Sequence, residues 1–176
     1  MPDPAGLELI ANELRERHPG STFDTLYYRD IATLEVEPER VLDALGWLRD
    51  DPTQQYGFLA SLHACDYLPA EPRFGVHYEL LNMERVERLH VRVRLADPGE
   101  EGLPEVDSCV DLFEAANFQE REAYDMFGIS FRGHPDMRRI LMPEDYEGWP
   151  QRRDFPMGGE PVLFTHNEHQ MPRWYE

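Results

Sequence analysis

Charged side chains that could perform acid–base chemistry are concentrated after residue 119. Glu122 and Asp125 stand three positions apart and could act as a general acid and a general base. Six arginines lie between residues 121 and 154, and their positive charge favours ionised carboxylates over a raised pKa. Structural ion pairing is therefore the better interpretation, with Arg121 and Asp125 at positions i and i+4 of one helix face.

Two groups of residues could be considered as metal ligands, because a metal site needs three or four converging donors. One group is His134 with Asp136, and the other is His166, Glu168 and His169. Prolines flank the second group, and nothing in its spacing holds the donors together. A free-standing metal-dependent enzyme built on these residues is the alternative from another functional class.

The cysteines exclude the usual sulfur-ligated cofactors. Cys65 and Cys109 stand 44 positions apart, with no CxxC pair and no third or fourth thiol, whereas an iron–sulfur or structural zinc site needs more ligands than these two. The sequence also lacks a nucleophile elbow, a Walker loop, a dinucleotide fingerprint and a His-Glu-x-x-His motif. We expect two buried reduced thiols, no cofactor in this chain and no independent catalytic site.

The charge balance excludes further classes of partner. All 17 basic residues are arginine and the net charge is −18, which disfavours both nucleic-acid phosphates and anionic lipid headgroups. No apolar run approaches the roughly 20 residues of a membrane-spanning helix, and the start of the chain lacks the features of a signal peptide. The sequence predicts a soluble cytosolic chain that does not insert into the membrane.

Apolar spacing predicts the elements that must position these residues in an α+β domain over residues 1–128. N-terminal helices are expected to pack on a largely antiparallel sheet, followed by a helical segment and an extended C-terminal tail. The polar run 82–87 is short enough for a hairpin. The predicted helices lie at about 5–18, 38–50 and 118–127, and the strands at 31–36, 56–62, 74–80 and 89–95.

Two local patterns add detail to this outline. Ser108 and Asp111 resemble a capping box that opens an apolar helical face towards residue 116. Three histidines, His63, His77 and His90, fall at strand positions, where solvent exposure or hydrogen bonding is the simplest interpretation.

Residues 129–176 are rich in proline, glycine and aromatic residues. Such a segment has little regular structure of its own but retains the large rings that anchor interfaces. It is predicted to be an extended segment that binds a partner protein. A tail folded back over its own sheet is the alternative.

Residues 120–156 resemble the signature of a family of respiratory complex I proteins, the 30 kDa or C subunits of NADH:quinone oxidoreductase. Its charged, glycine and proline positions recur at the family's offsets, and Arg153 stands where many members have lysine. The residues that carry the resemblance are Glu120-Arg121-Glu122, Asp125 to Gly128, Gly133 to Asp136, Arg138 to Ile140, Pro143, Tyr146 to Gly148, Pro150, Arg152 and Asp154 to Pro156.

The resemblance implies a non-catalytic structural subunit in the peripheral arm of the bacterial enzyme, on the cytoplasmic side of the inner membrane. That enzyme passes electrons from NADH through FMN and iron–sulfur centres to quinone and couples this to ion translocation. FMN and the clusters are then expected in partner subunits, and the chief partner is expected to be the large subunit that helps form the quinone site. An equivalent subunit of a related membrane-bound hydrogenase is the alternative within this class.

The signature segment is also the predicted interface with those partners. After the turn at residues 133–135, forked arginine side chains could bind carboxylates of a partner. A local alternative, Arg138 or Arg139 closing on Glu120 or Asp125 in the same chain, stays open. The predicted interface residues are Glu120, Arg121, Glu122, Asp125, His134, Asp136, Arg138, Arg139, Tyr146, Trp149, Arg152, Arg153, Asp154 and Phe155.

Overall fold

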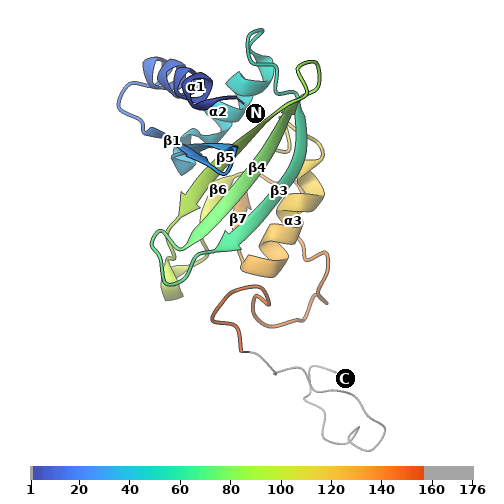
Figure 1. The fold of residues 1–176 in the computed structure, drawn as a ribbon. Coiled ribbons are helices and arrows are strands. Elements are labelled where there is room, and N and C mark those ends of the chain that lie inside the picture. Colours follow the sequence, from blue (N-terminus) through green and yellow to red (C-terminus); the bar gives the residue numbers. More distant parts are fainter. Residues whose placement is uncertain (1, 157–176) are drawn as a thin grey trace, which may run out of the picture.

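A computed structural model of the chain describes residues 2–156, which form an α+β fold (Figure 1). Within these residues, no helix combines the length and apolar character needed to cross a bilayer. The elements are α1 (Pro4–Arg17), β1 (Phe23–Tyr28), β2 (Ile31–Val36), η1 (Pro38–Arg40), α2 (Val41–Asp50), β3 (Phe58–Asp66), β4 (Phe74–Asn82), β5 (Glu87–Leu95), η2 (Gly99–Glu101), β6 (Glu105–Asp107), α3 (Ala116–Phe127) and β7 (Ser130–Arg132).

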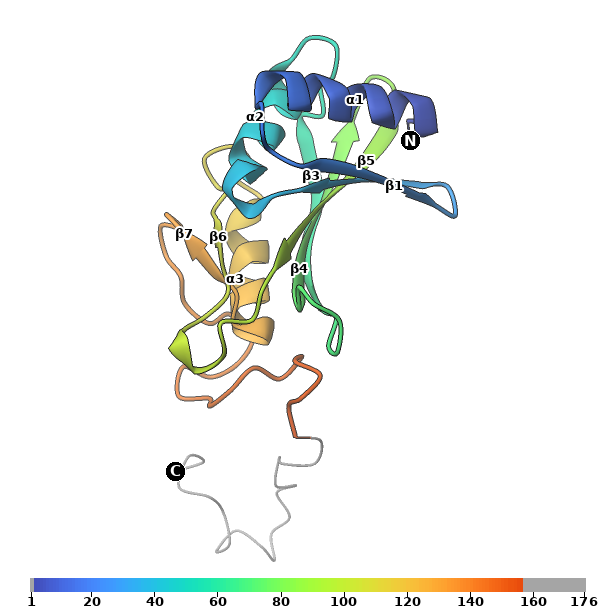
Figure 2. The same cartoon turned by 90° about the vertical axis from the view of Figure 1, so that its left-hand side faces the viewer.

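The main sheet has five strands in the order β1-β2-β5-β4-β3, so β1 and β3 form its two edges. All neighbours are antiparallel except the parallel pair β2 and β5. A second, parallel pair joins β6 to β7. Helix α3 and this pair lie on one side of strands β3 to β5, and no helix covers their other side in the described chain (Figure 2).

Local sequence accounts for most of these elements. Helix α1 begins where the Asp3 side chain accepts a hydrogen bond from the Gly6 N–H at 2.7 Å. In β4 and β5, apolar residues alternate with polar ones, so each strand places one set of side chains in the core. The buried residues of these elements are Leu7, Ile10, Ala11 and Leu14 in α1, Phe74, Val76, Tyr78 and Leu80 in β4, and Leu89, Val91, Val93 and Leu95 in β5.

The structure confirms the predicted fold class, the two N-terminal helices and the hairpin between β4 and β5. The predicted strand at 31–36 has those bounds as β2. Pro38 opens a single 3-10 turn before the α-helix proper. Three short or edge strands, β1, β6 and β7, have no counterpart in the prediction, because short irregular strands carry too few residues for a periodic signal.

The predicted capping box at Ser108 and Asp111 is wrong. Residues 109–115 form turns, and α3 begins only at Ala116, after Ala115, which makes no side-chain cap. The Ser108 hydroxyl instead donates to the Glu120 carboxylate at 2.6 Å. A tertiary contact has therefore taken the place of the local cap that the spacing indicated.

The alternation predicted for β3 also fails in part. Its pairing with β4 shifts between Leu59 and Ser61, so the inward-facing set changes from odd to even residues. As a result Leu59 and Leu62 are buried, whereas Phe58 is 49% exposed. A bulge of this kind re-aims side chains along an edge strand.

A row of three histidines crosses the sheet face that carries no helix. The ring centroids of His63 and His77, and of His77 and His90, are each 4.9 Å apart. His77 Nδ1 lies 2.7 Å from His90 Nε2. The Tyr67 hydroxyl lies 2.9 Å from His77 Nε2, and the Thr33 hydroxyl lies 3.1 Å from His90 Nδ1. The predicted hydrogen bonding is confirmed, but His77 is only 5% exposed.

Acidification is expected to destabilise the fold through this row. Burial first, and then its charged neighbours, lower the pKa of His77 to about 3 and that of His90 to about 4. An unfolded histidine titrates near pH 6.5, so below that value the unfolded state binds more protons and stability falls with pH.

Between about pH 7 and about pH 5, His77 alone is expected to lower the free energy of unfolding by about 2 kcal/mol. Urea titrations of the wild type and of His77→Gln across this range measure the effect. The variant should lose less stability, and parallel pH profiles would contradict the assignment.

Candidate partner-binding site

The segment Glu120 to Pro156 begins on α3, passes through β7 and ends in a loop at the lower end of the fold in Figure 1. This loop is irregular but tightly bonded to the rest of the chain. The Gln151 N–H donates to the Met126 carbonyl at 3.0 Å, and the Arg153 N–H donates to Asp66 Oδ2 at 2.9 Å. Residues 151 and 153 are thus bonded to helix α3 and to the end of strand β3 of the same chain.

Asp125 is the centre of this arrangement. Its side chain is fully buried on α3, and Oδ2 accepts the N–H groups of Ile140, Leu141 and Met142 at 3.0, 2.7 and 2.9 Å. Oδ1 accepts a bond from Arg139 at 2.6 Å. Burial alone would raise the pKa of Asp125, but these donors together lower it, so the carboxylate stays ionised and holds the loop.

Arg139 ties the same loop to the rings of the segment. Besides Asp125 it donates to the carbonyls of Tyr146 and Gly148, both at 2.9 Å, and its guanidinium lies 4.7 Å from the Trp149 ring centroid. The local ion pair left open by the sequence is thus formed by Arg139 and Asp125.

Gly128 ends α3 and makes room for the Trp149 ring. Its φ of +70° is strained for any residue with a side chain, and an added Cβ would lie 2.5 Å from the Trp149 ring. The Tyr124 and Trp149 rings pack edge to face with centroids 5.3 Å apart. The aromatic residues of the segment are therefore used inside the chain at these positions.

Glu120 is also an internal residue. Its carboxylate is buried and accepts the Cys109 N–H at 2.8 Å as well as the Ser108 hydroxyl. Burial raises the pKa of Glu120 although these hydrogen bonds oppose the change. Glu120 therefore anchors the turns that precede α3, and its side chain is closed to a partner.

The end of the described segment is held by Arg73, whose side chain is 6% exposed. Arg73 binds Asp66 through Nε at 3.1 Å and Nη2 at 2.8 Å, and it binds Asp97 and Asp154, each at 2.7 Å. Arg153 donates to the Leu68 carbonyl at 2.6 Å. This network, the Arg73 cluster, fixes residues 153 and 154 beside the end of β3.

Arg152 lies between the Arg73 cluster and the aromatic rings. Its Nε donates to the Phe127 carbonyl at 2.7 Å, and its guanidinium lies 4.8 Å from the Phe74 ring centroid. Burial lowers the pKa of Arg152. Phe155 stacks on Tyr146 with centroids 6.3 Å apart, so the last predicted interface residues also pack within the chain.

Other predicted residues lie nearer the surface. Arg121 donates to the carbonyls of Arg138 and Arg139 at 3.1 and 3.2 Å, so the helical pair predicted for Arg121 and Asp125 is not formed. Arg138 makes two bonds of 2.7 Å to Asp136, and its side chain is 62% exposed. Arg138 and Asp136 therefore lie on the outer surface of the loop.

The outer surface of residues 136–142, here called the display loop, carries exposed apolar side chains beside Arg138. Leu141 is 60% exposed and Ile140 is 36% exposed. Since Asp125 bonds the backbone of this loop from within, its exposed side chains are presented on a fixed backbone. A rigid, partly apolar, charged surface is suited to protein recognition.

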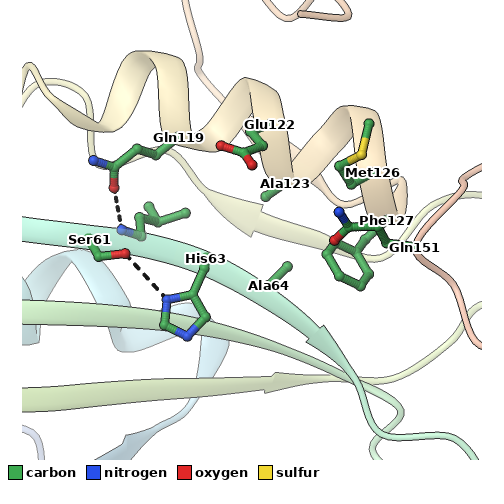
Figure 3. Close-up of a pocket in the computed structure, with 10 residues that line it drawn as sticks. Ser61, His63, Ala64, Gln119, Glu122, Ala123, Met126, Phe127 and Gln151 are labelled. Carbon is green, nitrogen blue, oxygen red and sulfur yellow. Dashed lines mark hydrogen bonds between the residues drawn. The ribbon is translucent and has the colours of Figure 1, made fainter. Parts of the chain in front are cut away.

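A groove of about 340 Å³ lies between α3 and the edge strand β3 (Figure 3). Glu122 is the one residue of the predicted interface that lines it. The Gln119 side chain of α3 accepts the Leu62 N–H of β3 across the groove. The lining residues are Ser61, Leu62, His63, Ala64, Gln119, Glu122, Ala123, Met126, Phe127 and Gln151.

The residues of β3 that line this groove were not predicted from the sequence. Ser61, His63 and Ala64 are small or polar residues without a motif of their own, and only the bulge in β3 and the packing of α3 place them near Glu122. No local pattern signals such a pairing, because the two elements are more than 50 positions apart in the chain.

The described residues provide no set of ligands for the metal site considered as an alternative. Within residues 2–156, no three His, Cys, Asp or Glu side chains are placed to hold a metal ion. His134 Nε2 lies 3.1 Å from the Asn117 carbonyl, and its Nδ1 accepts the Asp136 N–H at 3.0 Å. The group at residues 166–169 lies outside the described chain.

The two thiols have ordinary environments. Both cysteines are free, Cys109 buried and Cys65 partly so. Burial raises the pKa of each thiol, which keeps them protonated and unreactive.

Comparisons with known proteins agree on one family. Residues 34–161 match the model described as respiratory-chain NADH dehydrogenase, 30 kDa subunit. The chain is 43% identical over 159 residues to the NADH-quinone oxidoreductase C subunit of Roseiflexus castenholzii, with 90% of this chain and 89% of that protein covered. It is 49% identical over 137 residues to the protein of the same name in Herpetosiphon aurantiacus, covering 77% of each.

A likeness of fold extends to a solved structure. A chain in the structure of the membrane-bound sulfane sulfur reductase, an archaeal respiratory membrane complex, superposes with a TM-score of 0.65 and 24% identity. The match covers 85% of each chain. At this identity the comparison concerns the fold alone.

Proposed function

The chain belongs to the family of 30 kDa subunits of the respiratory-chain NADH dehydrogenase, and on that premise we propose that it is a structural subunit of bacterial NADH:quinone oxidoreductase. The match over residues 34–161 carries this proposal, because it runs from the second half of β2 through β7 and covers the whole signature segment. In the assembly, electrons pass from NADH to quinone and drive ion translocation. This chain contributes a scaffold and docking surfaces.

The redox groups of the assembly are proposed to lie in other subunits. FMN and the iron–sulfur clusters are assigned to partner subunits, and this chain is assigned none. Its two separated thiols and the backbone-bonded His134 support that division. The assembly is proposed to lie on the cytoplasmic face of the inner membrane, with this chain attached peripherally through other subunits.

The display loop is the proposed contact with the quinone-site large subunit and with neighbouring iron–sulfur subunits. Leu141 and Arg138 are exposed there, whereas Asp125 and Arg139 shape the loop from within. Exposed apolar and arginine side chains on a preorganised backbone are typical of interface anchors. The buried members of the predicted interface thus act as supports.

Purification of the native complex tests this function. An affinity-tagged chain, isolated from solubilised membranes of its host, should bring down NADH-binding, iron–sulfur and quinone-site subunits together with flavin and iron. Absence of those subunits would contradict the proposal. A nickel-ligating large subunit in their place would assign the chain to a related membrane-bound hydrogenase, and stoichiometric metal in the isolated chain would favour the free-standing enzyme.

Leu141→Asp is expected to reduce recovery of the partner subunits by roughly tenfold or more, because it places a charge in the centre of an apolar contact. Met83→Asp is the matched control, since Met83 is 66% exposed in the turn between β4 and β5, at the opposite end of the fold from residues 136–156 (Figure 1). Equal recovery with both variants would exclude the display loop from the interface.

A further inference from the structure

The groove between β3 and α3 has the arrangement of a site that accepts an extended peptide. An edge strand forms one wall and a helix forms the other (Figure 3). Side chains from Ala123, Met126 and Phe127 provide apolar surface, and Ser61, His63 and Gln151 are polar. Peptide-binding domains that add a strand to a sheet use such a groove, in which backbone hydrogen bonds give affinity and side-chain pockets give specificity.

The outer edge of β3 has no strand beside it in the described chain, although one of its backbone groups is already bonded by α3. The Leu62 N–H points away from β4, because it is bonded by the Gln119 side chain of α3. In an antiparallel strand, alternate residues direct their backbone groups to the same side, so Ala64 also faces outward. A side-chain amide thus occupies the position that a partner strand would take, and no strand lies beyond β3 in the described sheet.

We propose that this groove binds an extended segment of another subunit, which adds a sixth strand beside β3 and places a basic side chain against Glu122. The inference rests on the proposed function, because it requires a neighbouring subunit. Its location is distinct from the display loop, so the two contacts can be tested separately.

The charge of the groove determines the partner's chemistry. Glu122 is the only Asp, Glu or Arg side chain that lines the groove, and it makes no hydrogen bond or ion pair within residues 2–156. An exposed carboxylate above an apolar floor favours an arginine or lysine flanked by apolar residues. Phe58 on β3 and Phe118 on α3, 49% and 64% exposed, add apolar surface on the same two elements.

Within the described chain, residues 151–156 stop short of this part of β3. Arg153 is bonded to Asp66 and Leu68, at and beyond the end of the strand, and Gln151 is bonded to Met126. Residues 151–154 therefore close the far end of the groove and leave Ser61 and Ala64 partly exposed beside it. This geometry favours an occupant that enters from another chain.

Photo-crosslinking in the native complex tests the occupant. A benzoylphenylalanine at position 64 should crosslink to one extended segment of another subunit that contains arginine or lysine, as identified by mass spectrometry, and the same group at position 83 should not. Crosslinks only to this chain's residues 157–176, only to a second copy of the chain, or to no protein would each overturn the proposal.

A charge-reversal pair tests the assigned chemistry. Glu122→Arg should lower the crosslinking yield at position 64 by about tenfold, whereas Glu114→Arg, an exposed site just before α3, should leave it unchanged. Equal yields would overturn the role of Glu122. If the wild-type chain recovers its partner subunits but position 64 gives no intersubunit crosslink, the groove proposal fails while the proposed function stands.

Discussion

Replacing Asp125 by alanine is expected to lower the free energy of unfolding by roughly 3–5 kcal/mol, because it removes one partner of a buried ion pair. The substitution leaves the Arg139 guanidinium, 11% exposed, without its carboxylate and deprives three successive N–H groups of their acceptor. Thermal unfolding monitored by circular dichroism measures the change, with an expected decrease in Tm on the order of 10 °C.

Asp136→Ala is the matched control for this substitution. Asp136 also pairs with an arginine of the same loop, but at the surface, where a salt bridge contributes little. Its Tm should stay close to that of the wild type. If Asp125→Ala were equally mild, the buried carboxylate would not be the support of the display loop. Conversely, Asp125→Ala should abolish partner recovery even though Asp125 itself is inaccessible.

Replacing Arg73 by glutamine is expected to have an effect of similar size, roughly 3–5 kcal/mol. The guanidinium is shared by three carboxylates, and that of Asp66 is only 1% exposed. Burial alone would raise the pKa of Asp66, but hydrogen bonds led by Arg73 lower it to about 2. Without Arg73, the buried negative charge of Asp66 loses its main counterion. Asp154 loses the ion pair that joins its side chain to Arg73.

Limited trypsin digestion and urea titration together measure this second effect. In Arg73→Gln, cleavage after Arg152 and Arg153 should become faster, because residues 153 and 154 are no longer fixed beside β3. Asp154→Asn separates the two consequences, since it should expose the same bonds to trypsin while the domain keeps most of its stability. Unchanged cleavage in both variants would show that the Arg73 cluster does not restrain the segment.

The carboxylates of Asp66 and Asp125 and the histidine row affect stability in different pH ranges. Asp66 and Asp125 have lowered pKa values, so their stabilisation is complete above the unfolded value of about 3.9 and is lost only as the pH falls through the folded values. His77 begins to weaken the fold already below about pH 6.5. Between neutral pH and about pH 5, the histidines therefore account for the expected loss.

Buried and exposed members of the signature segment have different tasks. Hydrogen bonds within the chain are made by Asp125, Arg139, Glu120 and Arg152. In contrast, the exposed side chains include Glu122, Arg138 and Leu141. A family signature can thus be rich in charged residues without being an interface throughout. Internal ion pairs give the loop one shape, and the shape positions the few side chains that remain exposed.

The sequence by itself determined the secondary-structure elements that have strong local periodicity. It also determined the family to which the chain belongs. Helix α1, strand β2 and the hairpin of β4 and β5 follow from spacing that each segment carries on its own. The dense pattern of residues 120–156 identified the family.

Only the tertiary structure decided which charged residues face inward. Arg153 and Asp66 meet across 87 positions, and Asp125 bonds residues 139–142 rather than its helical neighbour Arg121. The bulge in β3 likewise set which strand residues line the groove. Local spacing fixes a local conformation, whereas the partner of a charge or of an edge strand depends on which distant segments pack together, and that is a property of the whole fold.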